Sequence, residues 1–468
     1  MDTREMPNIL IFVMDTQPVR NMTPYGFPKD TTPNIQKIAD EGVVYENHFE
    51  TGTWTLPSHA SLFTGKYQSG HGAGTSFTFV SRDIPTMAEV LGRAGYQTVA
   101  ISANTSWVRQ DEVDTGRGFE DFIDILPDRP EEDTFNEGDK GSTKALRAVK
   151  DWFDNGRNEE KPFLMFINCT EPHLRAWAAQ PFRGRFLLEG ASEEEARKVN
   201  QTPYEEYFGL VPDRPDGHMN GRDWAILKSL YDGETACLDH RMGLLFDYME
   251  ANKLLENTLL IITSDHGDLL DRKGYISHEP PALFDDLIHT PLIVRYPGVV
   301  PKGKRVKHLV QICDWLPTFV ELLGIEDANV IREMQGVSLV PTWSDGPVRD
   351  FAVAEHQASL IEADWFLRHD LDYRPWLVRL KTIRTLEWKY IWYSDGNDMI
   401  FDLVSDPGER NNLIEGERSR ASDMRLQLES FLLSIERRDY GDKLQGSYIP
   451  FVERLKAWGF FREPRFPT

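Results

Sequence analysis

The sequence predicts an α/β fold, in which a large parallel or mixed β-sheet is sandwiched by helices and a small antiparallel α+β subdomain follows at the C-terminal end. Two observations support this prediction. Apolar runs that fit strands buried on both faces recur up to Ser264, and helical patterns separate them. From about Phe351 onward, short strand patterns separated by turn residues replace this alternation.

Five strands are predicted in the alternating part of the chain. They cover residues 8–14, 43–49, 95–102, 162–168 and 258–264. The helices predicted between them cover residues 33–39, 58–66, 86–93, 144–153 and 227–252. Pro33 suits the first turn of its helix, and the helix at 58–66 begins either with Ser58 as its cap or through Thr55. Successive units of strand and helix form a parallel sheet that is covered on both faces.

The chain is predicted to contain two domains, because one hydrophobic core stops growing near about 250–300 residues. The main domain covers 1–350 and contains an inserted segment at about 174–223, where Gly, Pro and charged residues interrupt the periodic pattern. The C-terminal subdomain covers 351–468. Its strands are predicted at 379–385, 388–393 and 399–402, and its helix at about 418–435. The aromatic and basic tail that follows is expected to pack on the body or on a second subunit of a homo-oligomer.

The composition narrows the classes of partner. The chain has 75 acidic and 52 basic residues and a formal charge of −23, which repels nucleic acid, although the same acidity fits an adaptation for solubility. Its three cysteines are too few and too scattered for a disulfide framework or a zinc knuckle. The apolar run from Ile9 to Met14 is too short for a signal peptide or a membrane span. We therefore expect a cytoplasmic protein without a membrane partner, acting on a small anionic substrate.

Candidate site residues come at the ends of four predicted strands. These residues are Asp15, Asn104, His173 and the pair Asp265 and His266. In open α/β sheets the ligand crevice lies outside the carboxyl ends of the strands, so the four positions indicate one shared pocket. Carboxylate and imidazole groups are ligands that suit a divalent cation. A bound cation would also supply the local positive charge that a small anionic substrate needs.

Residues 55–66 carry a specific resemblance. They read Thr-Leu-Pro-Ser-His-Ala-Ser-Leu-Phe-Thr-Gly-Lys, which resembles the sulfatase signature Cys/Ser-x-Pro-Ser-Arg-x-x-x-Leu-Thr-Gly-Arg with Thr55 at the nucleophile position. Other stretches resemble the further motifs of the alkaline phosphatase and sulfatase superfamily in the same order, at 15–16, 30–35, 263–267, 314–318 and 401–413. The resemblance spans nearly the whole chain. It implies an alkaline phosphatase-like main domain that hydrolyses a phosphate-type or sulfate-type ester.

Several positions depart from the family pattern. Sulfatases convert the signature Cys or Ser to formylglycine, an aldehyde, and a threonine cannot form that aldehyde because its Cβ carries a methyl group. The signature Arg is replaced by His59 and the second acidic residue by Thr16. The Gly-Lys-Trp-His segment of the family is replaced by residues 102–107. Superfamily members that use a threonine nucleophile, such as nucleotide pyrophosphatase-like phosphodiesterases and phosphoethanolamine transferases, act on phosphorus, and the same chemistry is preferred here.

The resemblance assigns roles to individual residues. The metal ligands are Asp15, Thr55, Asp265 and His266. The catalytic residues are Thr55 as the metal-activated nucleophile, with His173 and His278 as proton donors or as contacts to the transferred group. The substrate-binding residues are His59, Lys66 and Asn104. One divalent ion is expected, Mn²⁺ or Zn²⁺ first and Ca²⁺ or Mg²⁺ as alternatives. Asp239 and His289 could bind a second metal ion, although a salt bridge is the favoured interpretation of the helical Asp239 and packing within a strand that of His289.

Three functions remain open from the sequence. The first is hydrolysis of a phosphodiester, phosphonate or phosphomonoester through a covalent intermediate on Thr55. The second is hydrolysis of a sulfuric ester without formylglycine. The third is an inactive homologue that keeps the fold for binding. Intact Asp15, Asp265 and His266 argue against the third function.

Overall fold

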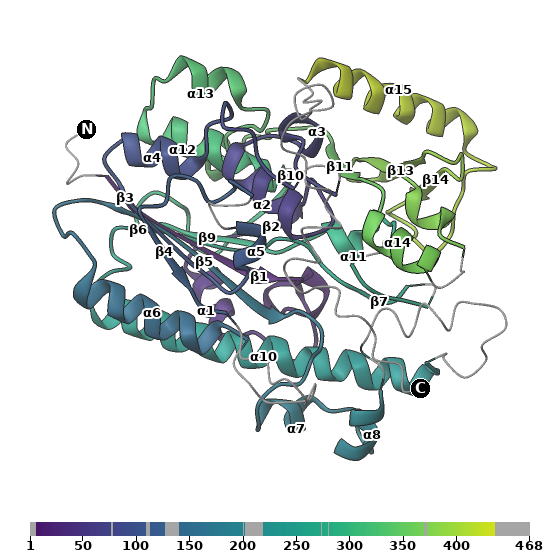
Figure 1. Ribbon diagram of the computed structural model, residues 1–468, viewed down its shortest axis with the longest axis horizontal. Helices are drawn as coiled ribbons and strands as arrows, with labels where there is room; N and C mark the ends of the chain where they lie inside the picture. The colour runs from purple at the N-terminus through teal and green to yellow at the C-terminus, as the bar shows by residue number, and fades with distance from the viewer. Residues whose placement is uncertain are drawn as a thin grey trace.

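The computed structural model describes residues 6–75, 78–108, 113–126, 140–199, 201, 219–272, 274–278, 280–368 and 372–435 (Figure 1). Its largest element is an eight-stranded sheet with the strand order β10-β2-β9-β6-β1-β5-β3-β4. The strands are β1 (Asn8–Asp15), β2 (Val43–Phe49), β3 (Gln97–Ser102), β4 (Asp121–Asp124), β5 (Phe163–Pro172), β6 (Thr258–Ser264), β9 (Leu292–Arg295) and β10 (Lys304–Gln311). All neighbouring strands are parallel except β9, which is antiparallel to both β2 and β6. The predicted mixed sheet is therefore confirmed.

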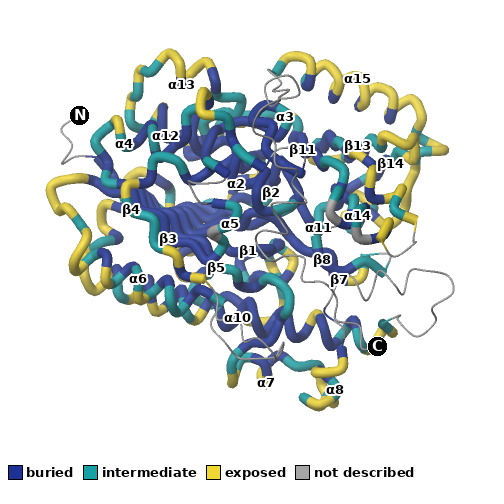
Figure 2. The backbone as a smooth tube through the Cα atoms, viewed as in Figure 1, coloured by how far each residue is buried: buried dark blue, intermediate teal, exposed yellow. Residues whose placement is uncertain are grey.

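Helices cover both faces of this sheet (Figure 1). One face carries α1 (Pro33–Asp40), α6 (Ser142–Asn155) and α10 (Gly221–Ala251), and the other carries α2 (Thr55–Thr64), α4 (Met87–Arg93) and α12 (Trp315–Leu323). Successive side chains of a strand point to opposite faces. In β1, Leu10 and Phe12 therefore join the core under α10, while Ile9 and Ile11 join the core under α2. Figure 2 shows the central strands as the most buried part of the molecule.

The second sheet belongs to the C-terminal region. Its four antiparallel strands run in the order β11 (Ala352–His356), β12 (Leu380–Arg384), β13 (Trp388–Tyr393) and β14 (Met399–Asp402). The helix α15 (Arg418–Ser434) packs against this sheet through Ala421, Met424, Leu428 and Leu432. The small antiparallel subdomain is confirmed. Residues 436–468, which include the tail predicted to pack on the body or on a second subunit, lie outside the described residues.

A buried ion cluster links the two sheets. The Lys389 ammonium, which is fully buried, lies 2.6 Å from Glu409 Oε1 and 2.7 Å from Asp285 Oδ1. Asp285 begins a short helix of the main domain, whereas Lys389 and Glu409 come from the C-terminal region. Breaking such a buried ion pair costs several kcal/mol, so the cluster fixes the subdomain against the main domain.

The remaining elements are short. The helices are α3 (Gln68–His71), α5 (Thr105–Val108), α7 (Phe182–Phe186), α8 (Glu193–Lys198), α11 (Asp285–Ile288), α13 (Ala328–Glu333) and α14 (Leu360–Arg368). The 3-10 helices are η2 (Val19–Asn21), η3 (Thr23–Tyr25), η5 (Ile312–Asp314), η6 (Val340–Ser344) and η7 (Arg374–Leu377). A two-stranded hairpin, β7 (Leu269–Arg272) and β8 (Tyr275–Ser277), follows β6. Helices α7 and α8 of the predicted insert lie beside α10 (Figure 1), while residues 202–218 of that insert lie outside the described residues. None of the helices in the described ranges combines the length and hydropathy needed to cross a bilayer.

Candidate active site

Four neighbouring strands bring the candidate site residues together. The strands β6, β1, β5 and β3 are adjacent in the sheet and mutually parallel, so their carboxyl ends meet at one edge. Asp265 and His266 follow β6, Asp15 ends β1, His173 follows β5 and Asn104 lies two residues beyond β3. The residues predicted at the strand ends therefore lie at one edge of the sheet.

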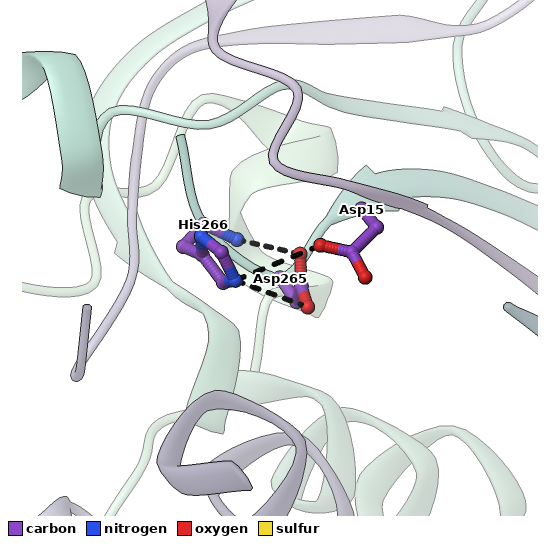
Figure 3. A group of neighbouring side chains, drawn as sticks. All are labelled: Asp15, Asp265 and His266. Atoms are coloured by element: carbon purple, nitrogen blue, oxygen red, sulfur yellow. Dashed lines mark hydrogen bonds and ion pairs between the residues drawn. The ribbon is translucent and has the colours of Figure 1, made fainter. Parts of the chain in front are cut away.

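Asp15, Asp265 and His266 form a cluster at this edge of the sheet (Figure 3). His266 Nε2 lies 3.7 Å from Asp15 Oδ1 and 3.5 Å from Asp265 Oδ2. One potential ligand atom from each of the three residues lies within 4.8 Å of the other two, and all three side chains are buried. Figure 3 shows the two carboxylates and the imidazole directed toward one another.

The hydrogen bond of the other ring nitrogen sets the tautomer of His266. His266 Nδ1 lies 3.0 Å from the carbonyl oxygen of Gly267. A carbonyl oxygen can only accept, so Nδ1 carries the proton and Nε2 of the neutral ring presents its lone pair to the carboxylates. Burial, with the nearby His278, lowers the pKa of His266 and favours this neutral form. Metal-binding histidines in proteins commonly have this second hydrogen bond.

Within the described part of the chain, neither carboxylate forms an ion pair with a Lys or Arg side chain. Burial, followed by the neighbouring Asp265, raises the pKa of Asp15 well above its ordinary value, and burial also raises the pKa of Asp265. Asp15 Oδ1 and Asp265 Oδ2 are buried and have no hydrogen-bond partner in the described part of the chain. Two unpartnered buried carboxylate oxygens beside an imidazole lone pair fit a divalent cation, which would satisfy all three atoms at once.

Thr55 opens the helix α2 at the edge of this cluster. Its Oγ1 lies 3.4 Å from His266 Nε2 and 3.5 Å from Asn104 Nδ2. The same Asn104 amide donates to Asp15 Oδ2 at 2.9 Å, which joins Thr55 to the carboxylates. Because Thr55 is the first residue of a ten-residue helix, free backbone N–H groups and the helix dipole favour an anion in its vicinity.

Comparison with known proteins assigns the chain to a family. The sulfatase family profile matches residues 7–325, more than half of the chain. The chain belongs to the sulfatase family. A second profile, described as N-sulphoglucosamine sulphohydrolase, C-terminal, matches residues 279–437 and includes the four-stranded sheet. The chain is accordingly an ester hydrolase of a family whose enzymes use a divalent metal ion.

Sulfatase-family relatives act on different esters. An N-acetylglucosamine-6-O-sulfatase of Bacteroides thetaiotaomicron is 24% identical, with 87% of this chain and 82% of the relative aligned. A choline-sulfatase of Rhizobium meliloti is 25% identical over 89% of this chain and 84% of the relative. The solved phosphonate monoester hydrolase of Agrobacterium radiobacter has a TM-score of 0.67 at 19% identity and covers 91% of this chain and 95% of its own, which establishes a shared fold.

His59 occupies the signature position at which the sulfatase family has Arg, and the structure buries it completely. Its Nδ1 donates to the carbonyl oxygen of Thr55 at 2.8 Å and lies 3.8 Å from Asp265 Oδ2. Its ring packs edge-on against Phe63 and Phe166. These contacts fix the first turn of α2 against the metal-ligand candidate Asp265. The structure thus gives His59 a contact to the backbone of Thr55, and its contact with substrate stays a prediction.

His173 and His278 lie beside His266. The His278 ring centroid is 4.5 Å from that of His266 and 5.2 Å from that of His173. His173 Nδ1 donates to the carbonyl oxygen of Leu174 at 2.6 Å, which orients its ring. Both side chains remain partly exposed, unlike His266, so they can reach a bound ester. The catalytic roles of both residues stay predictions.

Lys66 lies away from the metal-ligand candidates and pairs with Glu333, so the predicted substrate contact of this residue is wrong. Its buried ammonium donates to Glu333 Oε2 at 2.8 Å and to the carbonyl oxygen of Glu333 at 2.7 Å. Lys66 follows the C-terminal end of α2, whereas Thr55 starts it, and ten residues of helix are about 15 Å long. The end of the signature therefore anchors α2 to α13, where Glu333 lies.

Replacing Lys66 tests this structural role. We expect Lys66→Met to lower the free energy of unfolding by about 3 kcal/mol, because the Glu333 carboxylate would lose its buried counterion. The value of kcat/KM should stay within about twofold of wild type, since the ammonium lies far from Thr55. Urea unfolding and steady-state kinetics on the same preparation measure both effects. A loss of kcat/KM above about tenfold at unchanged stability would restore the substrate-binding role.

A second metal ion at Asp239 and His289 is not supported. Asp239 accepts from the backbone N–H groups of Asn34 at 3.1 Å and Ile35 at 2.8 Å, so it caps the start of α1. His289 Nε2 donates to the carbonyl oxygen of Glu46, and its ring stacks on Phe49. Within the described ranges, the cluster of Asp15, Asp265 and His266 is the one group of His, Cys, Asp and Glu with metal-site spacing.

The environment of Asp239 predicts a pH effect on stability. Burial raises the pKa of Asp239 from 3.8 to about 6, although hydrogen bonds from Ile35 and Asn34 oppose this shift. The folded protein therefore binds this proton more tightly than the unfolded chain, and the resulting stability is present below about pH 4 and lost as the pH rises through 6. We expect the free energy of unfolding of Asp239→Asn, relative to wild type, to increase by about 1 kcal/mol between pH 5 and 7.5. Urea unfolding at the two pH values measures it, and a constant difference would contradict the assignment.

Asp268 and Tyr231 were not predicted near this cluster from the sequence, and Thr16 was named only as a departure from the family's first metal motif. Asp268 is buried, and its Oδ1 lies 3.9 Å from His278 Nδ1. Thr16 has a left-handed backbone (φ 64°), which is unusual for a β-branched residue and directs its N–H to Asp265 Oδ1 at 3.2 Å. The Tyr231 hydroxyl of α10 donates to the carbonyl oxygen of Thr16 at 2.5 Å. Asp268 could have been found from its place just after Asp265-His266-Gly267, whereas nothing in the helix sequence distinguishes Tyr231.

Proposed function

We propose that this sulfatase-family chain hydrolyses phosphorus esters, namely phosphodiesters, phosphonate monoesters or phosphomonoesters, with Thr55 as its nucleophile. The observation that carries the proposal is the position of Thr55 Oγ1, 3.4 Å from His266 Nε2 at the start of a helix. An aldehyde cannot form at a threonine, so the hydroxyl itself is the attacking group. The phosphonate monoester hydrolase of Agrobacterium radiobacter shares the fold, which supports phosphorus chemistry as an activity that this scaffold can perform.

The residues around Thr55 suit a two-step displacement. The Thr55 oxygen forms a bond to phosphorus as the bond to the leaving oxygen breaks, and water later cleaves the phosphorylated threonine. Asn104 orients Thr55 Oγ1 and Asp15 relative to each other through one amide. We assign to His173 and His278, whose rings lie beside each other, the donation of the proton that the departing alkoxide takes up.

The metal ion would be bound by Asp15, Asp265 and His266, together with Thr55. When bound, it supplies the positive charge that makes the threonine hydroxyl acidic enough to attack. Two carboxylates, one imidazole and one hydroxyl form a mixed oxygen and nitrogen ligand set, which favours Mn²⁺ or Zn²⁺ over Ca²⁺ and Mg²⁺.

A panel of esters tests the proposal. The metal-free protein would be incubated with Mn²⁺ or Zn²⁺ and assayed with bis-p-nitrophenyl phosphate, p-nitrophenyl phenylphosphonate, p-nitrophenyl phosphate and p-nitrophenyl sulfate. The four substrates share one leaving group, so the comparison isolates the transferred group. We expect kcat/KM for at least one phosphorus ester to exceed that for the sulfate by about tenfold or more. The reverse order would overturn the proposal.

A sulfuric ester hydrolase that attacks directly through Thr55 is the second candidate. It is favoured by the curated relatives, which include an N-acetylglucosamine-6-O-sulfatase and a choline-sulfatase. The same panel decides between the two, with glucosamine 6-sulfate and choline sulfate added. An inactive binding homologue has no support in the site, because all three metal-ligand candidates are present and converge.

A further inference from the structure

The segment that precedes Thr55 is buried and hydrogen bonded within the main domain. It connects β2 to α2 and comprises residues 50–54. The Glu50 N–H donates to the carbonyl oxygen of Ile288 at 2.8 Å, and the Glu50 carboxyl accepts from Ser58 at 2.5 Å and from Thr290 at 2.8 Å. These contacts fix the Glu50 end of the segment. They do not reach Thr53 and Trp54, which determine where Thr55 starts the helix.

The other end of the segment is contacted by β11 of the C-terminal subdomain. The Glu355 N–H donates to the carbonyl oxygen of Thr51 at 2.9 Å, and His356 Nδ1 lies 2.8 Å from Thr53 Oγ1. Thr53 and His356 are both buried, and they are 303 residues apart in the chain. Thr53 is two residues before the proposed nucleophile.

His356 is itself fixed at both ring nitrogens. Its Nε2 lies 3.2 Å from Ser359 Oγ, while its Nδ1 contacts Thr53. Trp54 is the N-cap residue of α2 and provides no side-chain hydrogen bond to it, so the first turn is otherwise held from within the main domain by Ser58, which donates to Glu50, and by His59. The hydroxyl of Thr53 is therefore a polar anchor next to the helix start, and its partner belongs to the C-terminal subdomain.

We propose that His356 is a positioning residue for the nucleophile, which acts through Thr53 to set the place of Thr55 beside the metal ligands. The proposal rests on the proposed function of Thr55. It gives the C-terminal subdomain a part in catalysis, since one of its strands orients the reacting hydroxyl. A displacement of about 1 Å at a reacting group can cost about 100-fold in rate, so one hydrogen bond at this point has a large effect.

Variants of both partners test the contact. We expect His356→Ala and Thr53→Val each to lower kcat by about 10- to 100-fold, with KM within about threefold and metal content unchanged. Because both changes remove one hydrogen bond, the double variant should lose no more than the poorer single variant. His356→Asn places an amide near the former Nδ1 and should recover kcat to within about fivefold of wild type. Additive losses, or no recovery with Asn, would overturn the proposal.

A matched control separates positioning from general stability. Thr382 Oγ1 donates to the carbonyl oxygen of Tyr390 at 2.8 Å inside the same four-stranded sheet, and the residue is buried. Thr382→Val therefore makes the same chemical change as Thr53→Val without touching the segment before Thr55. We expect it to lower Tm to a similar extent and to leave kcat unchanged. An equal fall of kcat in both Thr→Val variants would assign the effect to destabilisation.

Amide hydrogen exchange gives a readout that needs no turnover. His356→Ala should increase exchange in peptides that cover residues 50–57, whereas Thr382→Val should not. Unchanged exchange in this segment would overturn the positioning role even if wild type hydrolyses every ester in the panel. Faster exchange in a protein that hydrolyses none of them would instead leave the contact established and refute the function proposed for Thr55, so the two failures are distinguishable.

Discussion

Thr55→Ala is expected to lower kcat for phosphorus ester hydrolysis by at least about 10³-fold, the scale of loss seen when a nucleophile is removed from a hydrolase. The reason is geometric, because Thr55 Oγ1 lies 3.4 Å from His266 Nε2. Steady-state kinetics with bis-p-nitrophenyl phosphate and Mn²⁺ would measure the loss. The metal content of the variant, determined by elemental analysis, would show whether the metal ligands remain in place.

Thr55→Ser is the matched control for this experiment. It keeps the hydroxyl and removes only the methyl group, so kcat should stay within about tenfold of wild type. In the wild-type enzyme, the peptide that contains residue 55 should have the mass calculated for an unmodified threonine at that position. Full activity of Thr55→Ala would show that another group attacks the ester, and an activated water molecule would then be the nucleophile.

The sequence was most informative at the ends of the apolar strands. Asp15 and Asp265 could be predicted as site residues because each follows an unbroken apolar run, which is typical of a strand buried on both faces. β10 was missed because basic and polar residues interrupt the few apolar ones within residues 304–311, and β9 because it is only four residues long. The reversed direction of β9 has no local signal either, since strand direction depends on pairing with distant residues.

The roles within the signature were predicted less well than its position. His59 lies four residues after Thr55 and thus on the same side of α2, but the direction of that side toward Phe166 depends on packing. Lys66 was assigned to substrate by resemblance, although a ten-residue helix separates it from the nucleophile. His356 could not be found from sequence at all, because its contact with Thr53 joins β11 to the distant connection between β2 and α2.

The second prediction with a large effect concerns the metal-ligand candidate Asp265. We expect the stability difference between Asp265→Asn and wild type to have opposite signs without and with the metal ion. In the metal-free protein Asp265 contributes a buried carboxylate whose pKa is raised by burial, so its charge destabilises the fold at neutral pH. Asp265→Asn removes that charge and can keep an acceptor for the N–H groups of Thr16 and His266, which donate to Oδ1 at 3.2 and 2.9 Å. We therefore expect the metal-free variant to be at least as stable as the metal-free wild type.

Addition of Mn²⁺ or Zn²⁺ should invert this order. At about 1,000 times its dissociation constant, a bound ion would stabilise the wild type by about 4 kcal/mol, whereas the variant, which lacks one of the two carboxylate ligands, should gain little and hydrolyse no ester. Thermal unfolding after chelation measures the stability of each protein without metal, and thermal unfolding after metal addition measures the stability gained from the ion. Asp239→Asn is the matched control, because it also neutralises a buried aspartate but should keep the full response to metal. If Asp265→Asn gained as much stability from the ion as wild type, the ion would bind elsewhere, and the attack by Thr55 would lose its physical basis.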